Sequence, residues 1–251
     1  MPHEGDPHER LWLSWPSRGY TLGDTAEDAE VARRTWAAVA NAAARFEPVT
    51  VVVAPRDVET APRYLDPSIE LRVREIDDAW IRDAGPTFVR GADGRLGAVT
   101  WVFNGWGRQQ WASWDNDSSL GPAVAEWAGA ERIDSQLVNE GGGIHVDGLG
   151  TVLVTETVQR DPDRNPGLSR AQIEQELART IGARTVIWLP RGLTRDSDEF
   201  GTRGHVDIVA TIPSPGRLLL HDQRNDAHPD RAVMAGIRRE LVEALDVRGE
   251  A

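Results

Sequence analysis

Acidic and histidine side chains occur in this sequence at positions that suit proton transfer and the binding of a cation. Asp83 follows Trp80-Ile-Arg and precedes Ala-Gly-Pro, a rigid corner that would place its carboxylate at a strand end. Glu140 precedes three consecutive glycines, which within a strand pattern usually indicate close approach by a backbone or a ligand. His205 and Asp207 are two residues apart, so on a strand they would face the same side. A histidine beside carboxylates can move protons and help to hold a cation.

Each of these residues also has a structural alternative. Asp83 could instead hold its own backbone in a turn, and Glu140 could belong to an irregular bulge. His205 could be a core histidine, with Asp207 as a cap of a helix or loop. For His145, which lies in the same glycine-rich block as Glu140, we favour a structural role.

Several classes of chemistry are excluded by the residue types and motifs of the chain. There is no cysteine, so a thiol nucleophile, thiolate metal ligands and disulfides are absent. All 28 basic residues are arginines, which excludes lysine Schiff-base chemistry. A metal site is the rival use of the acidic and histidine residues, but there is no His-x-x-x-His pair and no ladder of carboxylates, so no metal is predicted. A Gly-x-Ser-x-Gly nucleophile motif is also missing.

The composition indicates an ordinary globular protein with an acidic balance. The 251 residues include 40 acidic and 28 basic ones, a formal charge of -12. This balance argues against a general nucleic-acid binder and suits a site that attracts cations. The N-terminus lacks the apolar core of a signal peptide, and no apolar run approaches the length of a membrane span. We therefore expect a cytoplasmic chain without nucleic-acid or membrane partners.

The elements that must position these residues are helices alternating with strand pairs. Helix signals predict helices over 26–46, 123–128 and 170–181 and a further one that begins at Pro229. The first helix has a capping pair and an expected buried face formed by Ala32, Trp36, Val39, Ala43 and Phe46. The predicted hairpins join 79–89 to 96–103, 136–146 to 151–156, and 205–212 to 218–221. Residues 161–166 and 191–198 are predicted to be surface loops.

A polar cluster stands at the head of each predicted hairpin. Asp83, His145 and His205 are separated by roughly 60 residues, which indicates a repeated unit of hairpin plus helix. If such units are arranged around an axis, equivalent strand ends converge. Their polar heads can then share one central site.

Four sequence blocks carry a resemblance to a known family. They are PHERLWLSWP from Pro7, WIRDAGP from Trp80, NEGGGIHVDG from Asn139 and GHVD from Gly204, and they occur in this order. In these blocks the chain resembles the agmatine deiminase family, which is related to the bacterial peptidyl-arginine deiminases. The resemblance runs over residues 7–245, essentially the whole chain. It implies an α/β fold, a pseudo-symmetric five-fold propeller of the pentein type with its active site on the central axis.

The resemblance also implies a reaction and the residues that perform it. The reaction is hydrolysis of agmatine to N-carbamoylputrescine and ammonia, in polyamine (putrescine) biosynthesis or arginine catabolism, with no metal or organic cofactor. Asp83 and Asp207 correspond to the carboxylates that hold the substrate guanidinium, and Trp80 is a further expected substrate-binding residue. Glu140 and His205 correspond to the catalytic acid/base pair. Carboxylates suit this task because they accept the paired donors of a planar guanidinium bidentately.

One departure from the family concerns the nucleophile. The family attacks the guanidinium carbon with a cysteine from a glycine-rich block near its C-terminus, and this chain contains no cysteine. We therefore expect residues 1–251 to form a single agmatine deiminase-like domain, incomplete at the C-terminus and inactive by that route. A missing part of the ring would expose apolar surface, which homo-oligomer formation would cover. Two alternatives stay open: a non-catalytic guanidinium-binding or vestigial protein, and a metal-assisted hydrolase.

Overall fold

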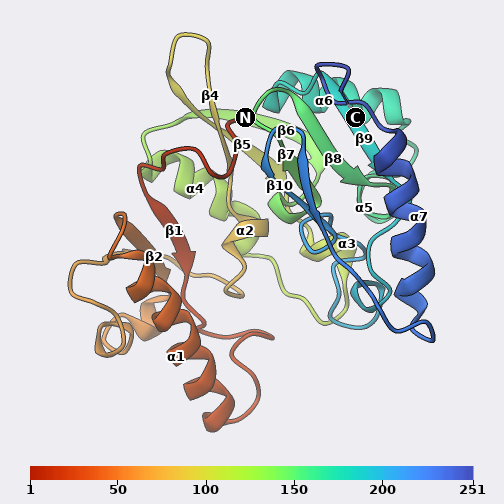
Figure 1. Ribbon diagram of the computed structural model, residues 1–251. Coiled ribbons are helices and arrows are strands. Elements are labelled where there is room, and N and C mark those ends of the chain that lie inside the picture. The colour runs from red at the N-terminus through yellow and green to blue at the C-terminus, as the bar shows by residue number, and fades with distance from the viewer. Residues whose placement is uncertain (251) are drawn as a thin grey trace.

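A computed structural model describes residues 1–250 as small β-sheets with helices packed around them (Figure 1). Within this range the strands form four separate sheets. They are β1 (Leu11–Ser14), β2 (Val49–Val53) and β3 (Glu70–Val73); β4 (Thr87–Arg90), β5 (Leu96–Val102) and β6 (Glu131–Val138); β7 (Ile144–Val146), β8 (Thr151–Thr155) and β9 (Thr185–Leu189); and β10 (Ala210–Ser214) with β11 (Arg217–Leu220). The expected α/β class is confirmed.

Six α-helical segments lie between these strands, and a seventh follows the last strand, within residues 1–250. They are α1 (Ala26–Ala43), α2 (Ile81–Ala84), α3 (Gly105–Arg108), α4 (Leu120–Trp127), α5 (Glu156–Gln159), α6 (Arg170–Ile181) and α7 (Pro229–Glu243). Short 3-10 turns lie at η1 (Pro55–Asp57), η2 (Ala61–Arg63), η3 (Asp117–Ser119), η4 (Gly141–Gly143) and η5 (Arg195–Ser197).

The predicted repeat of hairpin plus helix is visible in the strand pairing. β4 pairs antiparallel with β5, and β5 pairs parallel with β6 across α4. β7, β8 and β9 repeat this arrangement across α5 and α6, and the hairpin of β10 and β11 is followed by α7. A parallel pair requires a crossover connection, which the helices supply. The first sheet differs, because β1, β2 and β3 are all parallel.

Helix α1 begins as predicted but buries a different face. The Thr25 hydroxyl accepts a hydrogen bond from Asp28 N at 3.1 Å, which forms the expected capping box. The helix ends at Ala43 rather than at residue 46, and its buried residues are Ala32, Ala37 and Ala40. The predicted face was wrong for Val39 and Phe46, which are 53% and 85% exposed. Alanine lets a helix approach a sheet closely, so the small residues rather than the large ones face the core.

The other predicted helices are confirmed with small shifts. Ser169 and Gln172 form the expected capping box of α6, and Gly182 ends this helix in the left-handed conformation that glycine favours. Helix α4 begins at Leu120, before Pro122, because proline is tolerated in a first turn. Helix α7 buries Ile237 and ends at Glu243.

Two of the predicted hairpins begin with a turn instead of a strand. Residues 81–84 form the single helical turn α2, because the amides of Ala84 and Gly85 donate to the carbonyls of Trp80 and Ile81. Residues 206–209, directly after His205, form a turn, because Val209 N and Ala210 N both donate to the Val206 carbonyl. The prediction that His205 and Asp207 share one face of a strand was therefore wrong.

The buried hydrophobic residues form four clusters rather than one continuous core. Met1 and Val247, from the two ends of the chain, both contact the sheet of β7, β8 and β9 or the helix α6 beside it. The Met1 amino group donates to the Ile181 carbonyl at 2.7 Å, and Val247 N donates to the Thr151 hydroxyl at 3.0 Å. Figure 1 accordingly shows both termini above β7 and β8, with β1, β2 and α1 at the opposite side.

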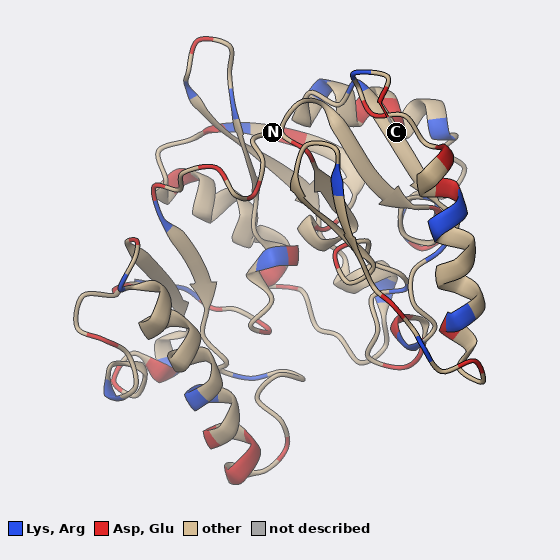
Figure 2. Ribbon diagram, viewed as in Figure 1, with Lys and Arg blue, Asp and Glu red and all other residues tan. Residues whose placement is uncertain are grey.

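Acidic and basic segments lie next to each other on α2 and α7 (Figure 2). Among residues 1–250, no helix is long and apolar enough to span a membrane.

Candidate active site

Three of the predicted hairpin heads come together in the structure although they are far apart in sequence. Asp83 lies on α2 just before β4, Glu140 precedes η4 and β7, and His205 lies in the turn before β10. His205 Nε2 is 3.2 Å from Glu140 Oε2, and His205 Nδ1 is 3.8 Å from Asp83 Oδ1. All three side chains are buried. The repeated units thus bring their polar heads to one place.

Backbone and aromatic donors fix the Asp83 carboxylate. Its Oδ1 accepts a hydrogen bond from Gly142 N at 3.1 Å, and its Oδ2 accepts one from Trp106 Nε1 at 2.9 Å. The α2 turn that presents Asp83 ends at Gly85, where any side chain would collide with the Ile81 carbonyl. The Gly-Pro corner therefore sets the position of this carboxylate, as its sequence context predicts.

Gly142 lies where the site residues meet. A Cβ atom on Gly142 would lie less than 3.0 Å from His205 Nδ1, Asp207 Oδ2 and Asp83 Oδ1. Asp207 also donates its amide to the Gly142 carbonyl at 3.3 Å. Glycine at this position leaves space between two carboxylates and an imidazole. This space explains why the second of the three consecutive glycines cannot carry a side chain.

The Glu140 carboxylate is an anion in a fully buried position. Burial favours its neutral form, but the adjacent Arg164 guanidinium and the His205 ring together lower the pKa of Glu140 to about 2. Arg164 Nε donates to both of its oxygens, at 3.0 and 3.2 Å. Glu140 is therefore an anion at neutral pH.

The pKa values of His205 and Asp207 are both raised in this site. Burial disfavours the charged form of His205, but Asp83, Glu140 and Asp207 outweigh it and raise its pKa to about 9. The ring is thus an imidazolium at pH 7. Asp207 retains an exposed outer side, yet the atoms packed around its carboxylate, with help from Asp83, raise its pKa to about 6. A site with a proton donor beside acceptors can perform acid/base chemistry.

The aromatic side chain that bonds Asp83 is Trp106, which the sequence analysis did not single out. Trp80 caps the start of α2, and its partly exposed indole packs edge-on against Trp36 at a centroid distance of 5.8 Å. Trp106 is buried and has a backbone φ of 57°, between Gly105 and Gly107 at 68° and 81°. A Gly-Trp-Gly run is the sequence signal that could have identified it, since left-handed backbone favours glycine.

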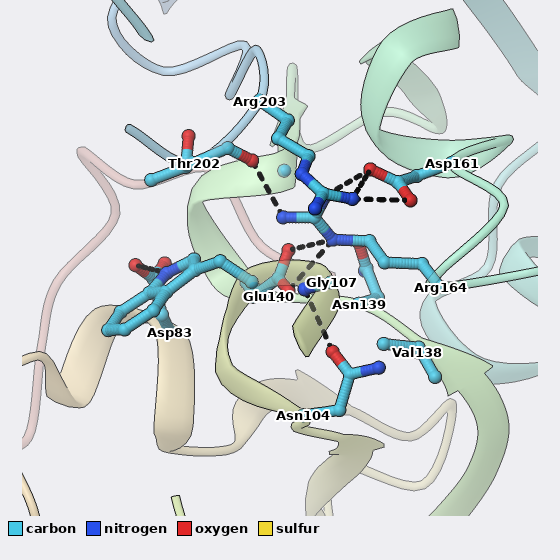
Figure 3. A network of polar contacts seen from close by, with 12 residues as sticks. Asp83, Asn104, Gly107, Val138, Asn139, Glu140, Asp161, Arg164, Thr202 and Arg203 are labelled. Atoms are coloured by element: carbon cyan, nitrogen blue, oxygen red, sulfur yellow. Dashed lines mark hydrogen bonds and ion pairs between the residues drawn. The ribbon is translucent and has the colours of Figure 1, made fainter. Parts of the chain in front are cut away.

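Sequence reasoning also missed Arg164. Residues 161–166 were predicted to form a surface loop, and this was wrong for Asp161, Arg164 and Asn165, which are buried. Arg164 reaches Glu140 from this segment, and its other nitrogens bond Asp161 and the Thr202 carbonyl (Figure 3). The Asp-Pro-Asp-Arg composition gave no signal of burial, because its partners lie in other parts of the chain.

His145 has a structural role, as expected. Its ring is buried, and Nε2 accepts a hydrogen bond from Ile212 N at 2.8 Å. Nε2 also lies 3.0 Å from the Thr211 hydroxyl oxygen, so the ring joins β7 to β10. Burial lowers the pKa of His145, which keeps the ring neutral and able to accept.

We expect His145→Ala to lower the free energy of unfolding by about 1–3 kcal/mol, because the buried Ile212 N–H loses its acceptor. Urea unfolding measures this loss, and His145→Gln, which keeps an acceptor, should lose less. A His145→Ala variant of unchanged stability would contradict the structural role.

Within residues 1–250, no group of three or more histidine, cysteine, aspartate and glutamate side chains is arranged to hold a metal ion.

Comparison with known proteins identifies relatives over the whole length of the sequence. The profile of the family described as Porphyromonas-type peptidyl-arginine deiminase matches residues 1–251. A Streptomyces coelicolor protein that is provisionally named an agmatine deiminase is 53% identical over 230 residues, which are 92% of this chain and 68% of that protein. The agmatine deiminase of Stutzerimonas stutzeri is 41% identical over 260 residues, covering 100% of this chain and 68% of that one.

A solved structure agrees with this similarity. The agmatine deiminase of Enterococcus faecalis superposes with a TM-score of 0.91 and 33% identity, covering 100% of this chain and 68% of that chain. This chain thus spans about two thirds of the length of these relatives.

Proposed function

Because the chain belongs to the Porphyromonas-type peptidyl-arginine deiminase family and is a homologue of agmatine deiminases, we propose that its site serves the hydrolysis of agmatine to N-carbamoylputrescine and ammonia. In this proposal, residues 1–251 supply the carboxylates that bind the guanidinium and the pair that transfers protons. The observation that carries it is the convergence of Asp83, His205 and Asp207 around Gly142.

Asp83 and Asp207 are the proposed guanidinium ligands. A guanidinium is planar and carries five N–H donors, so two carboxylates facing one small space can bind it along two of its edges. Glu140 is a poorer candidate for this task, because both of its oxygens already accept from Arg164. Trp80 stays a prediction as a further binding residue, since its indole is 37% exposed at the start of α2.

Glu140 and His205 are the proposed acid/base pair. Hydrolysis replaces a C–N bond with a C–O bond, so the departing nitrogen must gain a proton and the incoming water must lose one. Once a nucleophile has added to the guanidinium carbon, His205, as an imidazolium with a pKa of about 9, can protonate the nitrogen that leaves as ammonia. Residues 1–251 contain no cysteine to make that addition. The neutral ring can then accept a proton from water, and Glu140 at 3.2 Å keeps it oriented through both steps.

A small cavity beside Trp106 supports agmatine over arginine as substrate. The cavity has a volume of about 110 Å³ and is lined by Asp77, Asp78, Trp106 and Trp111, with Arg18 at the same place. Arg18 donates to Asp77, and the Asp78 carboxylate accepts from the amides of Thr21 and Ala79, so the aromatic faces are the surfaces open to a second cation. Two carboxylates against one arginine favour the primary ammonium of agmatine over the α-carboxylate of arginine.

The proposed reaction requires no redox or group-transfer cofactor, and we propose none.

The repeated hairpin-and-helix units with converging heads support a pseudo-symmetric α/β propeller formed by one domain over residues 1–251.

Agmatine affinity should fall by up to about tenfold between pH 7 and pH 5. Of Glu140, His205 and Asp207, only Asp207 has a pKa within this range, about 6, so acidification neutralises one guanidinium ligand. The ionised fraction of a group with a pKa of about 6 falls about tenfold between pH 7 and pH 5, which sets the largest expected loss.

Isothermal titration calorimetry of residues 1–251 with agmatine measures this dependence and tests the proposed function. Asp207→Asn should bind weakly at both pH values, with the dependence between pH 5 and 7 removed. Absence of agmatine binding by the unmodified chain at pH 7 would refute the proposed function.

A further inference from the structure

Arg164 is a fully buried arginine that connects three separate segments beneath the site. Its side chain has 0% exposure, and Nε donates to Glu140 at 3.0 and 3.2 Å. One terminal nitrogen lies 3.2 Å from Asp161 Oδ2, and the other donates to the Thr202 carbonyl at 2.7 Å. Figure 3 shows the guanidinium with Glu140 on one side, Asp161 on another and Thr202 above it.

The contact with Glu140 satisfies a charge that burial would otherwise make costly. An ionised carboxylate away from water needs a cation and hydrogen bonds to remain charged. Glu140 has Arg164 and His205 as its polar side-chain partners among residues 1–250. His205 gives up its own proton in the proposed reaction, so Arg164 is the partner that stays positive throughout.

The contact with Thr202 reaches the loop that carries His205. In this loop the Asp196 carboxylate accepts hydrogen bonds from the amides of Thr202, Gly204 and His205, at 2.8, 2.7 and 2.9 Å. Arg164 holds the same loop through the Thr202 carbonyl. One guanidinium therefore touches both Glu140 and the loop from which His205 projects.

We infer that Arg164 is the positioning residue of this site. It fixes the Glu140 carboxylate beside His205 and holds the Glu140 segment and the His205 loop in a constant relative position. This role rests on the proposed function of Glu140 and His205 as the acid/base pair. Arg164 touches neither His205 nor the space around Gly142 through a hydrogen bond of the described chain, so it acts through Glu140. The ionisation of Glu140 is the property that should depend on it most directly.

The test is an NMR titration of the Glu140 side-chain carboxyl carbon in residues 1–251 labelled with 13C-glutamate, with Glu140→Gln to assign the signal. The unmodified chain should show no Glu140 transition between pH 8 and pH 4. In Arg164→Gln the proton affinity of Glu140 should rise at least tenfold, by one pH unit or more, and Arg164→Lys, which keeps the charge, should restore most of the ionisation.

Arg203→Gln is the matched control. Arg203 bonds Asp161 and Asp163 from the same loop but does not bond Glu140, so its loss should leave the Glu140 signal unchanged. If the Glu140 carboxyl signal titrates at the same pH in Arg164→Gln and Arg203→Gln, the inference is overturned. If Arg164→Gln does not fold, the double variant Arg164→Gln with Glu140→Gln decides. Recovery of folding supports the inference, and failure to fold beside a folded Arg203→Gln overturns it.

These results are separable from the proposed function. The titration of Glu140 needs no substrate, whereas agmatine binding by the unmodified chain tests the function itself. A shifted Glu140 signal without any agmatine binding would thus leave Arg164 as the positioning residue of a site with another ligand.

Discussion

Agmatine incubated with residues 1–251 should release no ammonia above the buffer blank. The site has carboxylates to hold a guanidinium and an imidazolium to protonate a leaving group, but the sequence has no cysteine to attack the guanidinium carbon. A resonance-stabilised guanidinium is a poor electrophile, and covalent catalysis by an activated nucleophile is what divides its hydrolysis into easier steps. A coupled ammonia assay over many hours measures this result.

The informative control is His205→Ala. Measured ammonia release that disappears in this variant would show that His205 activates water directly, and it would overturn the expectation. Binding of agmatine without release is the result expected of residues that hold the guanidinium but have no cysteine to attack it.

The second large effect is expected from a single methyl group. Gly142→Ala should weaken agmatine binding by about 100-fold or more, because the new Cβ lies within 3.0 Å of His205, Asp207 and Asp83 atoms and must displace them. Loss of two charge-assisted hydrogen bonds at roughly 1.5–3 kcal/mol each accounts for this factor. Calorimetry with agmatine at pH 7 measures it.

Gly236→Ala is the control for the effect of the substitution itself. Gly236 lies inside α7 with no atom within 4 Å of a built Cβ, so alanine should leave binding unchanged and favour the helix slightly. Unchanged affinity in Gly142→Ala would mean that the space between the three side chains is not where agmatine binds.

The features that the sequence predicted best have local causes. The caps of α1 and α6 depend on residues three positions apart, and Gly182 ends α6 because glycine adopts a left-handed conformation at little cost. The repeat was also detectable, because equal spacing of the heads follows from units of equal construction. The repeat correctly predicted that Asp83, Glu140 and His205 lie close together, even though the strand assignments around two of these residues were wrong.

The features that escaped prediction depend on distant contacts. Arg164 lies in a charged, proline-containing segment typical of a loop at the surface, and it is buried only because Glu140 and Thr202 meet it from 24 and 38 residues away. On α1, hydrophobic periodicity selected Val39 and Phe46, whereas close packing on the sheet selected alanines. Neither outcome is encoded within a short window of sequence.

The central claim, that Asp83, Glu140, His205 and Asp207 form a guanidinium site, is tested most directly by NMR titration of residues 1–251 with agmatine and with 1,4-diaminobutane, which lacks the guanidinium. We predict saturable shifts of the Gly142 amide and the His205 ring with agmatine, no such shifts with 1,4-diaminobutane, and loss of the agmatine response in Asp83→Asn. Equal responses to the two amines, or an agmatine response that leaves Gly142 and His205 unchanged, would contradict the claim.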